Sequence, residues 1–127
     1  MAINILIVDD SSTMRGFIKR TLQSTGLPLG DIWEAGNGRQ GLEQMEAHWV
    51  DLVLADLNMP DMTGVEMINI MSENAMLSSL PVVVVSSENN QAVLDSLAQK
   101  GVREFVRKPF RAVLLQEIIE KVLSTAG

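Results

Sequence analysis

Short apolar runs alternate with longer amphipathic stretches along this chain. The apolar runs are bounded by Gly, Asn or Pro, which is typical of buried strands. Five such runs are found: Ile3 to Val8, Asp31 to Ala35, Leu52 to Ala55, Val82 to Val85 and Glu104 to Arg107. The second and fifth are short, and they carry the weakest strand signals.

Apolar residues in the amphipathic stretches recur at the spacing of one-sided helices. A first helix follows Ser11-Ser12-Thr13, whose hydroxyls can cap it, and stops at Gly26-Leu27-Pro28. A second runs from Gly36-Asn37-Gly38 to about His48. The third opens at Thr63-Gly64, the fourth follows Ser86 to Asn90, with Ser87 as the candidate cap, and the fifth covers Phe110 to Ser124. The residues expected inward on the last three are Val65, Ile68, Met71 and Ala75; Val93, Leu94, Leu97 and Ala98; and Leu114, Leu115, Ile118, Ile119 and Val122.

Strict alternation of strand and helix predicts an α/β fold with a doubly wound parallel sheet. Helices then cover both faces, and the crossovers are right-handed. No repeat, linker or low-complexity segment interrupts the pattern, so residues 1–127 are predicted to form one domain. Parallel strands buried on both faces read as continuous apolar runs, as they do here.

Composition narrows the function classes. A hydrophobic content of 46% with 20% charged residues is globular, and a net charge of −6 argues against nucleic acid as a partner. There is no cysteine and only one histidine, His48, which excludes thiolate catalysis and histidine-based metal sites. No apolar stretch approaches the roughly 20 residues that span a bilayer, and no signal peptide is apparent. We expect a cytoplasmic protein without membrane contact.

Charged residues follow three of the predicted strands. Asp9-Asp10 comes after the first, Asp56 after the third and Lys108-Pro109 after the fifth. Because the carboxyl ends of parallel strands share one edge, these side chains can converge. Carboxylates about 4 Å apart repel by roughly 4 kcal/mol per pair at an effective dielectric near 20, so a cation and a phosphoryl group would explain the cluster. For Asp9-Asp10 alone, capping of the next helix remains an equal alternative.

Four segments resemble a response-regulator receiver domain: Ile5 to Arg15, Asp56 to Pro60, Val85-Ser86 and Lys108 to Phe110. They occur in the family's order over almost the whole chain. The resemblance implies a flavodoxin-like five-stranded sheet of strand order 2-1-3-4-5 with five helices. It also implies a cis Lys108-Pro109 bond. Ser12 to Arg15 resembles most the stand-alone chemotaxis type of receiver.

The resemblance implies a role for each charged residue. Asp56 would be the phosphoacceptor, and Lys108 would pair with a phosphoryl oxygen. Asp10, Asp56 and the backbone carbonyl of Asn58 would bind Mg²⁺ directly, and Asp9 would bind it through water. A hard cation that takes oxygen ligands fits this donor set. The chain would then be a phosphoacceptor, and it would be no enzyme beyond its own phosphotransfer and autodephosphorylation.

Further positions have implied roles in switching. Ser86 and Phe105 correspond to the two switch residues, with Phe105 where many members have Tyr. Asn58 and Glu88 correspond to the positions that tune phosphoryl lifetime, and their side chains suggest a short-lived signal. Thr63 stands where the family usually has Asp, and Thr can still cap a helix.

By resemblance the leading function is a monomeric, diffusible switch. A histidine kinase would phosphorylate it, and its face of fourth helix, fifth strand and fifth helix would then bind a flagellar motor switch protein or another protein target. A phosphatase is a further partner. The alternatives are a phosphorelay intermediate, a phosphate sink, a receiver-like module that is never phosphorylated and an aspartyl-nucleophile phosphohydrolase. The phosphohydrolase would need an acid where Asn58 stands.

Other residues are read as structural. Trp33 and Trp49 are expected to pack, and five methionines are expected to fill the core and rim around the third helix: Met59, Met62, Met67, Met71 and Met76. Three arginines, Arg103, Arg107 and Arg111, form either a basic edge for an acidic partner or an ordinary solvated face.

Overall fold

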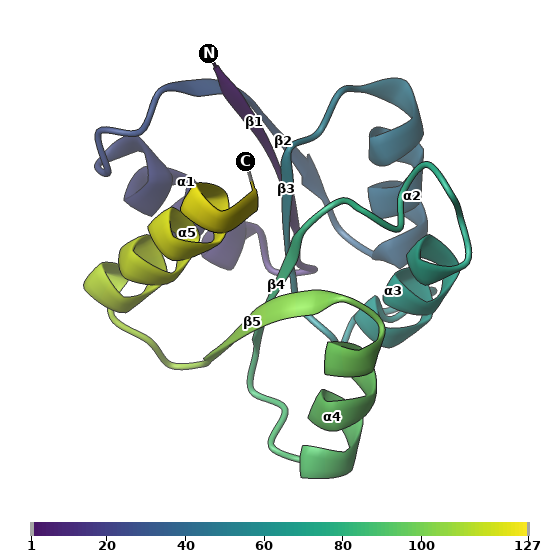
Figure 1. The fold of residues 1–127 in the computed structure, drawn as a ribbon. Coiled ribbons are helices and arrows are strands. Elements are labelled where there is room, and N and C mark those ends of the chain that lie inside the picture. Colours follow the sequence, from purple (N-terminus) through teal and green to yellow (C-terminus); the bar gives the residue numbers. More distant parts are fainter. Residues whose placement is uncertain (1, 127) are drawn as a thin grey trace.

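The computed structural model describes residues 2–126, with side chains through residue 124. One sheet of five parallel strands crosses the domain between two helical layers (Figure 1). The strands are β1 (Ile3–Val8), β2 (Leu29–Ala35), β3 (Leu52–Ala55), β4 (Val82–Ser86) and β5 (Val102–Arg107). Their spatial order is β2-β1-β3-β4-β5. The predicted fold class and strand order are therefore confirmed.

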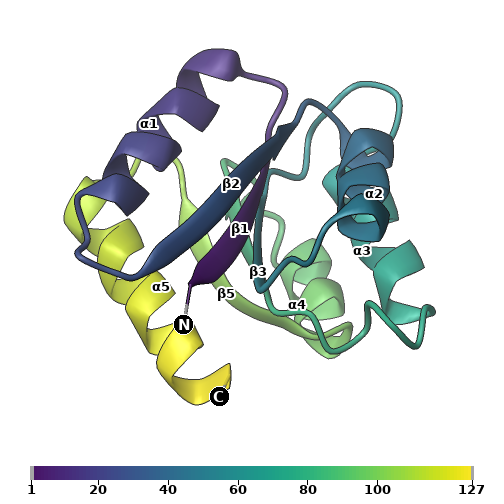
Figure 2. The same cartoon turned by 90° about the horizontal axis from the view of Figure 1, so that it is seen from above.

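Five helices cover the sheet: α1 (Ser12–Gln23), α2 (Gly38–Ala47), α3 (Gly64–Ser72), α4 (Gln91–Gln99) and α5 (Ala112–Ala126). Helices α1 and α5 lie on one face, and α2, α3 and α4 lie on the other (Figures 1 and 2). Among residues 2–126, no helix has both the length and the apolar character needed to cross a bilayer.

Strand β1 shows how the sheet separates two cores. Ile5 and Ile7 pack in the cluster beneath α1 and α5, whereas Leu6 and Val8 pack in the cluster beneath α2, α3 and α4. All four are completely buried. Successive strand side chains point to opposite faces. Each fully buried side chain contributes roughly 1.5–3 kcal/mol, so the central strands hold the sheet edge rigidly in place.

Side-chain caps fix where helices begin. The Ser11 hydroxyl accepts a hydrogen bond from the Met14 N–H (3.1 Å) and caps α1, in the predicted segment. For α4 the predicted cap was wrong. Asn90, rather than Ser87, caps this helix, and its side-chain oxygen accepts the first free N–H groups of the helix. Asn is as good an N-cap as Ser, and its position three residues later shortens the helix.

Several element boundaries differ from those predicted. Strand β2 begins two residues before Asp31 and pairs Leu29 with Ile3, and β5 begins at Val102, which pairs with Val82. Hydrogen bonds to the neighbouring strands extend β2 and β5 beyond the residues whose sequence pattern predicts a strand. Helix α3 ends at Ser72, so Ala75 lies outside it and is exposed. Helix α5 starts at Ala112, two residues later than predicted.

Besides Ala75, four side chains expected inward are exposed instead. Trp49 is 79% exposed, Met76 is 88% exposed and Leu114 is 44% exposed; Ala98 is exposed as well. In α5 the buried positions are Leu115, Ile119 and Val122, whose three- and four-residue spacing already fills the side that faces the sheet. The other tryptophan, Trp33, packs as predicted: it contacts the core, and its ring stacks on that of His48 with the ring centroids 4.2 Å apart.

Candidate functional site

The ends of β1 and β3 bring two acids together. Val8 pairs with Ala55, and the Asp56 N–H donates to the Val8 carbonyl (2.9 Å), so Asp9 and Asp56 lie next to each other beyond the paired residues. Asp9 is 1% exposed and Asp56 is 8% exposed. Asp10 follows on the exposed side. One carboxylate oxygen from each acid lies within 4.8 Å of the other two.

Lys108 reaches this cluster from β5. Its Nζ lies 2.8 Å from Asp9 Oδ2 and 3.1 Å from Asp56 Oδ2, and its backbone N–H donates to the Ser86 carbonyl (2.9 Å). Burial lowers the pKa of Lys108. Hydrogen bonds to Asp9 and Asp56 and the charge of both acids outweigh that effect and raise the pKa above its usual 10.5. Lys108 is therefore an ammonium at neutral pH. The Lys108-Pro109 bond is cis, as predicted.

The charges of this cluster do not balance. Three carboxylates face one ammonium, and two of those carboxylates are buried. Repulsion between ionised neighbours in such a place is a few kcal/mol per pair, about 4 at 4 Å and an effective dielectric of 20. Hard carboxylate oxygens on one rim are the donor set that Mg²⁺ takes. The cluster therefore fits a divalent cation, and Asp9, Asp10 and Asp56 could hold it.

The loop after Asp56 is packed closely against it. The Leu57 N–H donates to Asp56 Oδ1 (2.7 Å), and the Gly64 N–H donates to the Leu57 carbonyl (2.9 Å). A Cβ at Gly64 would lie 2.0 Å from the Asp56 carbonyl oxygen, so only glycine fits there. Thr63 caps α3 and forms a capping box with Glu66, which confirms that Thr serves in place of Asp.

A bridge between two loops was not predicted. Asn37 Nδ2 donates to Asp61 Oδ2 (3.3 Å), and the Gly38 N–H donates to the Met62 carbonyl (2.8 Å). Asp61 has a φ of 62°, a left-handed conformation that Asp tolerates better than most residues. The bridge holds the loop that carries Asn58, itself exposed. The Gly36-Asn37-Gly38 turn was visible in the sequence, but its partner across the loops was not.

Two predicted switch and tuning positions, Ser86 and Glu88, lie at the end of β4, and Phe105 lies within β5. Ser86 is 3% exposed, and its hydroxyl accepts the Glu88 N–H (3.2 Å). Glu88 Oε2 accepts the N–H groups of Asn89 (3.2 Å) and Asn90 (3.0 Å), so this carboxylate is turned toward the start of α4. Phe105 is half-buried and packs against the core beneath α2, α3 and α4.

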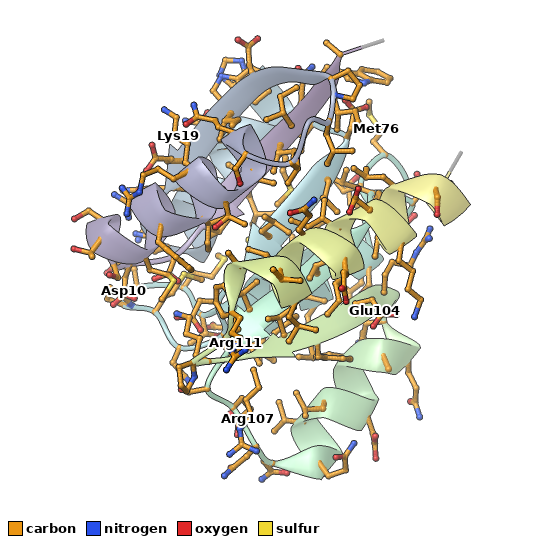
Figure 3. The ribbon with its side chains drawn as sticks, turned by 90° about the vertical axis from the view of Figure 1, so that its left-hand side faces the viewer. Asp10, Lys19, Met76, Glu104, Arg107 and Arg111 are labelled. Carbon is orange, nitrogen blue, oxygen red and sulfur yellow. The ribbon has the colours of Figure 1, made fainter. Side chains whose placement is uncertain are left out.

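Side chains on the β5 and α5 side are shown in Figure 3. Arg107 and Arg111 lie where β5 gives way to α5, and both are exposed (Figure 3). Toward the other end of β5, Glu104 pairs with Lys121 of α5 (2.9 Å). Arg103, near the start of β5, is exposed as well, so all three arginines face solvent, and their use by an acidic partner stays a prediction.

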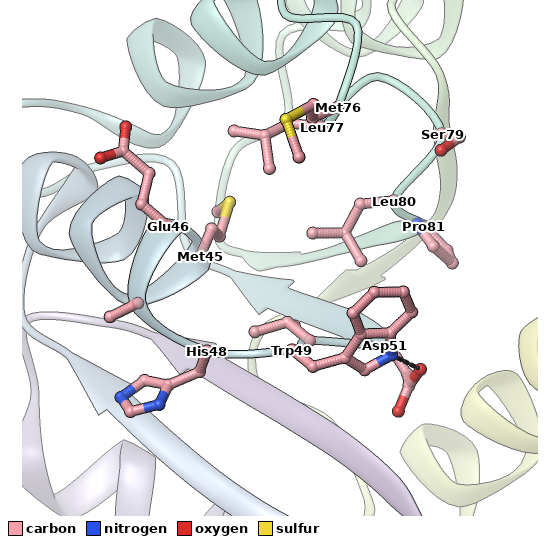
Figure 4. A pocket seen from close by; sticks show the side chains of 12 residues that line it. Met45, Glu46, His48, Trp49, Asp51, Met76, Leu77, Ser79, Leu80 and Pro81 are labelled. Carbon is pink, nitrogen blue, oxygen red and sulfur yellow. Dashed lines mark hydrogen bonds between the residues drawn. The ribbon is translucent and has the colours of Figure 1, made fainter.

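A cavity of about 490 Å³ lies at the opposite edge of the sheet (Figure 4). Its lining includes Met45, Trp49, Met76, Leu77, Leu80 and Pro81. Its acids are Glu46 and Asp51, and Asp51 accepts hydrogen bonds from Trp49 Nε1 (3.0 Å) and the Asn4 N–H (2.8 Å). Neutral donors thus satisfy Asp51. This hollow holds none of the clustered charge, so the candidate reaction site is the carboxyl edge.

Comparisons with known proteins agree with this geometry. Residues 5–120 match the family described as response regulator receiver domain. The chain is 39% identical to the chemotaxis protein CheY of Pseudomonas aeruginosa over 118 residues, which cover 93% of this chain and 94% of that protein. It is 33% identical to the chemotaxis protein CheY1 of Helicobacter pylori over 122 residues, 95% and 97% of the two chains.

A solved structure resembles it over nearly the same span. The CheX–CheY–BeF₃–Mg²⁺ complex of Borrelia burgdorferi contains a chain with a TM-score of 0.84 and 25% identity, covering 95% of this chain and 89% of that one. The family match, the chemotaxis relatives and the fold agree with one another. The chain therefore belongs to the response regulator receiver family, as a CheY-like receiver domain of two-component signalling.

Proposed function

We propose that this chain is a single-domain response regulator that accepts a phosphoryl group on Asp56 from a histidine kinase. One observation carries the proposal: Lys108 Nζ contacts both Asp9 and Asp56, while Asp10 lies beside them in the same cluster. This leaves the site with more negative charge than its own residues neutralise. A site of that kind suits a cation and an incoming phosphoryl group.

The metal ligands we propose are Asp10, Asp56 and the backbone carbonyl of Asn58, with Asp9 acting through water. Support comes from the three carboxylate oxygens within 4.8 Å of one another. When bound, Mg²⁺ offsets repulsion among the carboxylates and neutralises charge on the transferring phosphoryl group. The bridge from Asn37 to Asp61 keeps the Asn58 loop in place for this purpose.

In the transfer step an Asp56 oxygen attacks phosphorus, and the bond from phosphorus to the kinase imidazole nitrogen breaks. The electron pair of that bond returns to the imidazole. Catalysis is mostly positioning and electrostatics, because phosphoryl transfer passes through a loose, in-line transition state. The Leu57 N–H orients Asp56 Oδ1. The Lys108 ammonium, which contacts Asp56 Oδ2 at 3.1 Å, would exchange this contact for one with a phosphoryl oxygen.

Phosphorylation would then shift a two-state equilibrium. The Ser86 hydroxyl would leave the Glu88 N–H and bond to the phosphoryl group, and Phe105 would rotate inward. A ligand shifts such an equilibrium only by its differential affinity for the two states, here the new hydrogen bond of Ser86. The altered face of α4, β5 and α5 would bind a flagellar motor switch protein.

The lifetime of the phosphoryl group would be short and set by Asn58 and Glu88. Glu88 currently accepts two backbone N–H groups at the start of α4, so it would have to release them to reach the site. A phosphatase would be a further partner. We propose that the protein acts as a cytoplasmic monomer and does not turn over a separate substrate.

Acetyl phosphate tests the phosphoacceptor directly. With Mg²⁺, wild-type protein should gain the mass of one phosphoryl group, measured on the intact protein, and Asp56→Asn should gain none. Asp51→Asn is the matched control, because Asp51 immediately precedes the same strand, and it should be modified like wild type. If wild-type protein gained nothing under these conditions, the proposal would be wrong.

A binding experiment tests the chemotaxis role. Beryllofluoride mimics the phosphoryl group, so wild type with beryllofluoride and Mg²⁺ should bind an immobilised flagellar motor switch protein more tightly than wild type alone. Asp56→Asn should show no such increase. Phosphoryl transfer onward to a histidine phosphotransfer protein, without motor binding, would instead support the phosphorelay alternative.

A further inference from the structure

Arg15 joins the first helix to the ends of two strands. It lies in the first turn of α1, and its guanidinium donates from Nε to Glu34 Oε1 (2.9 Å) and from Nη1 to the Asp9 carbonyl (2.5 Å). Its side chain is 20% exposed, whereas that of Glu34, on β2, is 38% exposed. A planar fork with fixed donors can hold two acceptors at once in one geometry.

These contacts fix the backbone on both sides of Asp10. The Asp9 carbonyl, in the peptide unit before Asp10, is held by Arg15, and the Ser11 N–H, in the unit after it, donates to Asp9 Oδ1 (2.9 Å). The Asp10 side chain is exposed, and the described part of the chain supplies it with no hydrogen bond or salt bridge. No side-chain contact therefore orients Asp10, and the backbone sets where its Cα–Cβ bond points.

We infer that Arg15 is a positioning residue for metal binding, which acts by holding the peptide unit that aims Asp10 at the cation. The inference rests on the proposed Mg²⁺-dependent function and adds a residue to it. Arg15 itself would not touch the metal. Groups that orient ligands in this way typically change metal affinity by 10- to 100-fold when they are lost.

The sign of the effect separates positioning from simple electrostatics. Arg15 is a cation near a cation site, so its charge by itself opposes Mg²⁺ binding, an effect that Glu34 partly neutralises. If charge were all that mattered, Arg15→Gln would bind Mg²⁺ more tightly. If positioning dominates, the same substitution binds Mg²⁺ more weakly. Arg15→Lys keeps the charge but loses the fork, so positioning predicts weakening there too.

The test is calorimetric titration of Mg²⁺ into metal-free protein, without any phosphodonor. We expect Arg15→Gln and Arg15→Lys to raise the Kd for Mg²⁺ by about tenfold. Arg20→Gln is the matched control: Arg20 is an exposed arginine near the other end of α1, and its loss removes the same charge from the same helix. This control should stay within about twofold of wild type.

A double-mutant cycle links the effect to Asp10. In an Asp10→Asn background the ligand that Arg15 aims is already gone, so adding Arg15→Lys should change the remaining Mg²⁺ affinity little. Tighter binding by Arg15→Gln, wild-type affinity in Arg15→Lys, or an undiminished effect in the Asp10→Asn background would each overturn the inference. So would failure of Arg15→Lys to fold, which would assign Arg15 to the fold itself. A wild-type protein that binds no Mg²⁺ would contradict the proposed function instead.

Discussion

Strand β3 carries an aspartate immediately before it and another immediately after it, and the two have different surroundings. Asp51 accepts one hydrogen bond from Trp49 Nε1 and one from the Asn4 N–H, so neutral donors engage both of its oxygens. Asp56 accepts one from the Leu57 N–H, but its other oxygen shares the Lys108 ammonium with Asp9.

The difference shows what distinguishes an aspartate with a structural role from one placed to bind a ligand. At the amino end, neutral donors satisfy both oxygens of Asp51, and Glu46, the other acid that lines the neighbouring cavity, lies on a different side of it (Figure 4). At the carboxyl end, strand pairing holds several carboxylates against one another, and Lys108 neutralises only part of their charge. A bound cation would relieve that repulsion, and it would also neutralise the charge of an incoming phosphoryl group. Residue type is the same at both ends.

The largest expected change in stability comes from the loss of Lys108. Lys108→Met leaves Asp9, 1% exposed, without its cation and should lower the free energy of unfolding by about 3 kcal/mol. Urea denaturation in EDTA measures this, and Mg²⁺ should restore part of the loss because it replaces the missing charge. Lys121→Met, which breaks the more exposed pair with Glu104, should cost less than about 1 kcal/mol. Equal losses in the two variants would contradict this prediction.

Alkaline pH should remove the same charge with a smaller effect, because the neutral amine can still form hydrogen bonds. The pKa of Lys108 is raised above 10.5 in the folded protein, so its stabilising charge is fully present below that pH and lost as pH rises through the folded value. The stability difference between wild type and Lys108→Met, measured by urea denaturation, should therefore shrink only above about pH 10.4. If the stability difference instead shrank between about pH 6 and 8, the titration of another group would be responsible.

Asp51→Asn tests the amino end. An amide keeps one acceptor oxygen, so one of the hydrogen bonds from Trp49 and Asn4 must be lost, and the free energy of unfolding should fall by about 1 kcal/mol. Trp49 fluorescence should change as its indole N–H loses order. Phosphorylation by acetyl phosphate should stay at the wild-type level, and its loss would show that the two ends of β3 are coupled.

The smallest expected effect has the opposite sign. Asp10→Asn removes one of the clustered charges without breaking any described hydrogen bond of that side chain, so it should raise the free energy of unfolding in EDTA. The gain should be below about 1 kcal/mol, because Asp10 is exposed and water screens its charge. Thermal denaturation with and without Mg²⁺ provides the check: the variant should also lose most of the stabilisation by Mg²⁺. Destabilisation in EDTA would mean that Asp10 has a structural role.

Much of the site followed from the ends of the predicted strands. Asp9, Asp56 and Lys108 were expected to converge, because parallel strands finish at one edge. In the structure Lys108 Nζ lies 2.8 Å from Asp9 Oδ2 and 3.1 Å from Asp56 Oδ2. The contacts of Arg15 and Asn37 were not expected. Arg15 bonds Glu34 on β2, and Asn37 bonds Asp61 in the loop after β3, and local patterns contain no signal for pairings at such separations.

Burial was predicted less well than topology. Trp49 was expected to pack because it is large and apolar, yet it is 79% exposed, with its indole held by Asp51. Leu114 was placed inward by its helical spacing, but one stripe of α5 already filled the space against the sheet. Counting apolar residues shows how much surface can be buried, and it does not show which residue is left over.

The sequence by itself determined the alternation of strands and helices, the acids at strand ends and the absence of thiol chemistry, because these depend on residue type and local spacing. Only the tertiary structure decided which acid is satisfied and which is not, where β2 and β5 begin, and how Arg15 holds the backbone around Asp10. The physical reason is that hydrogen-bond partners and solvent screening come from segments distant in the chain, and only folding brings those segments together.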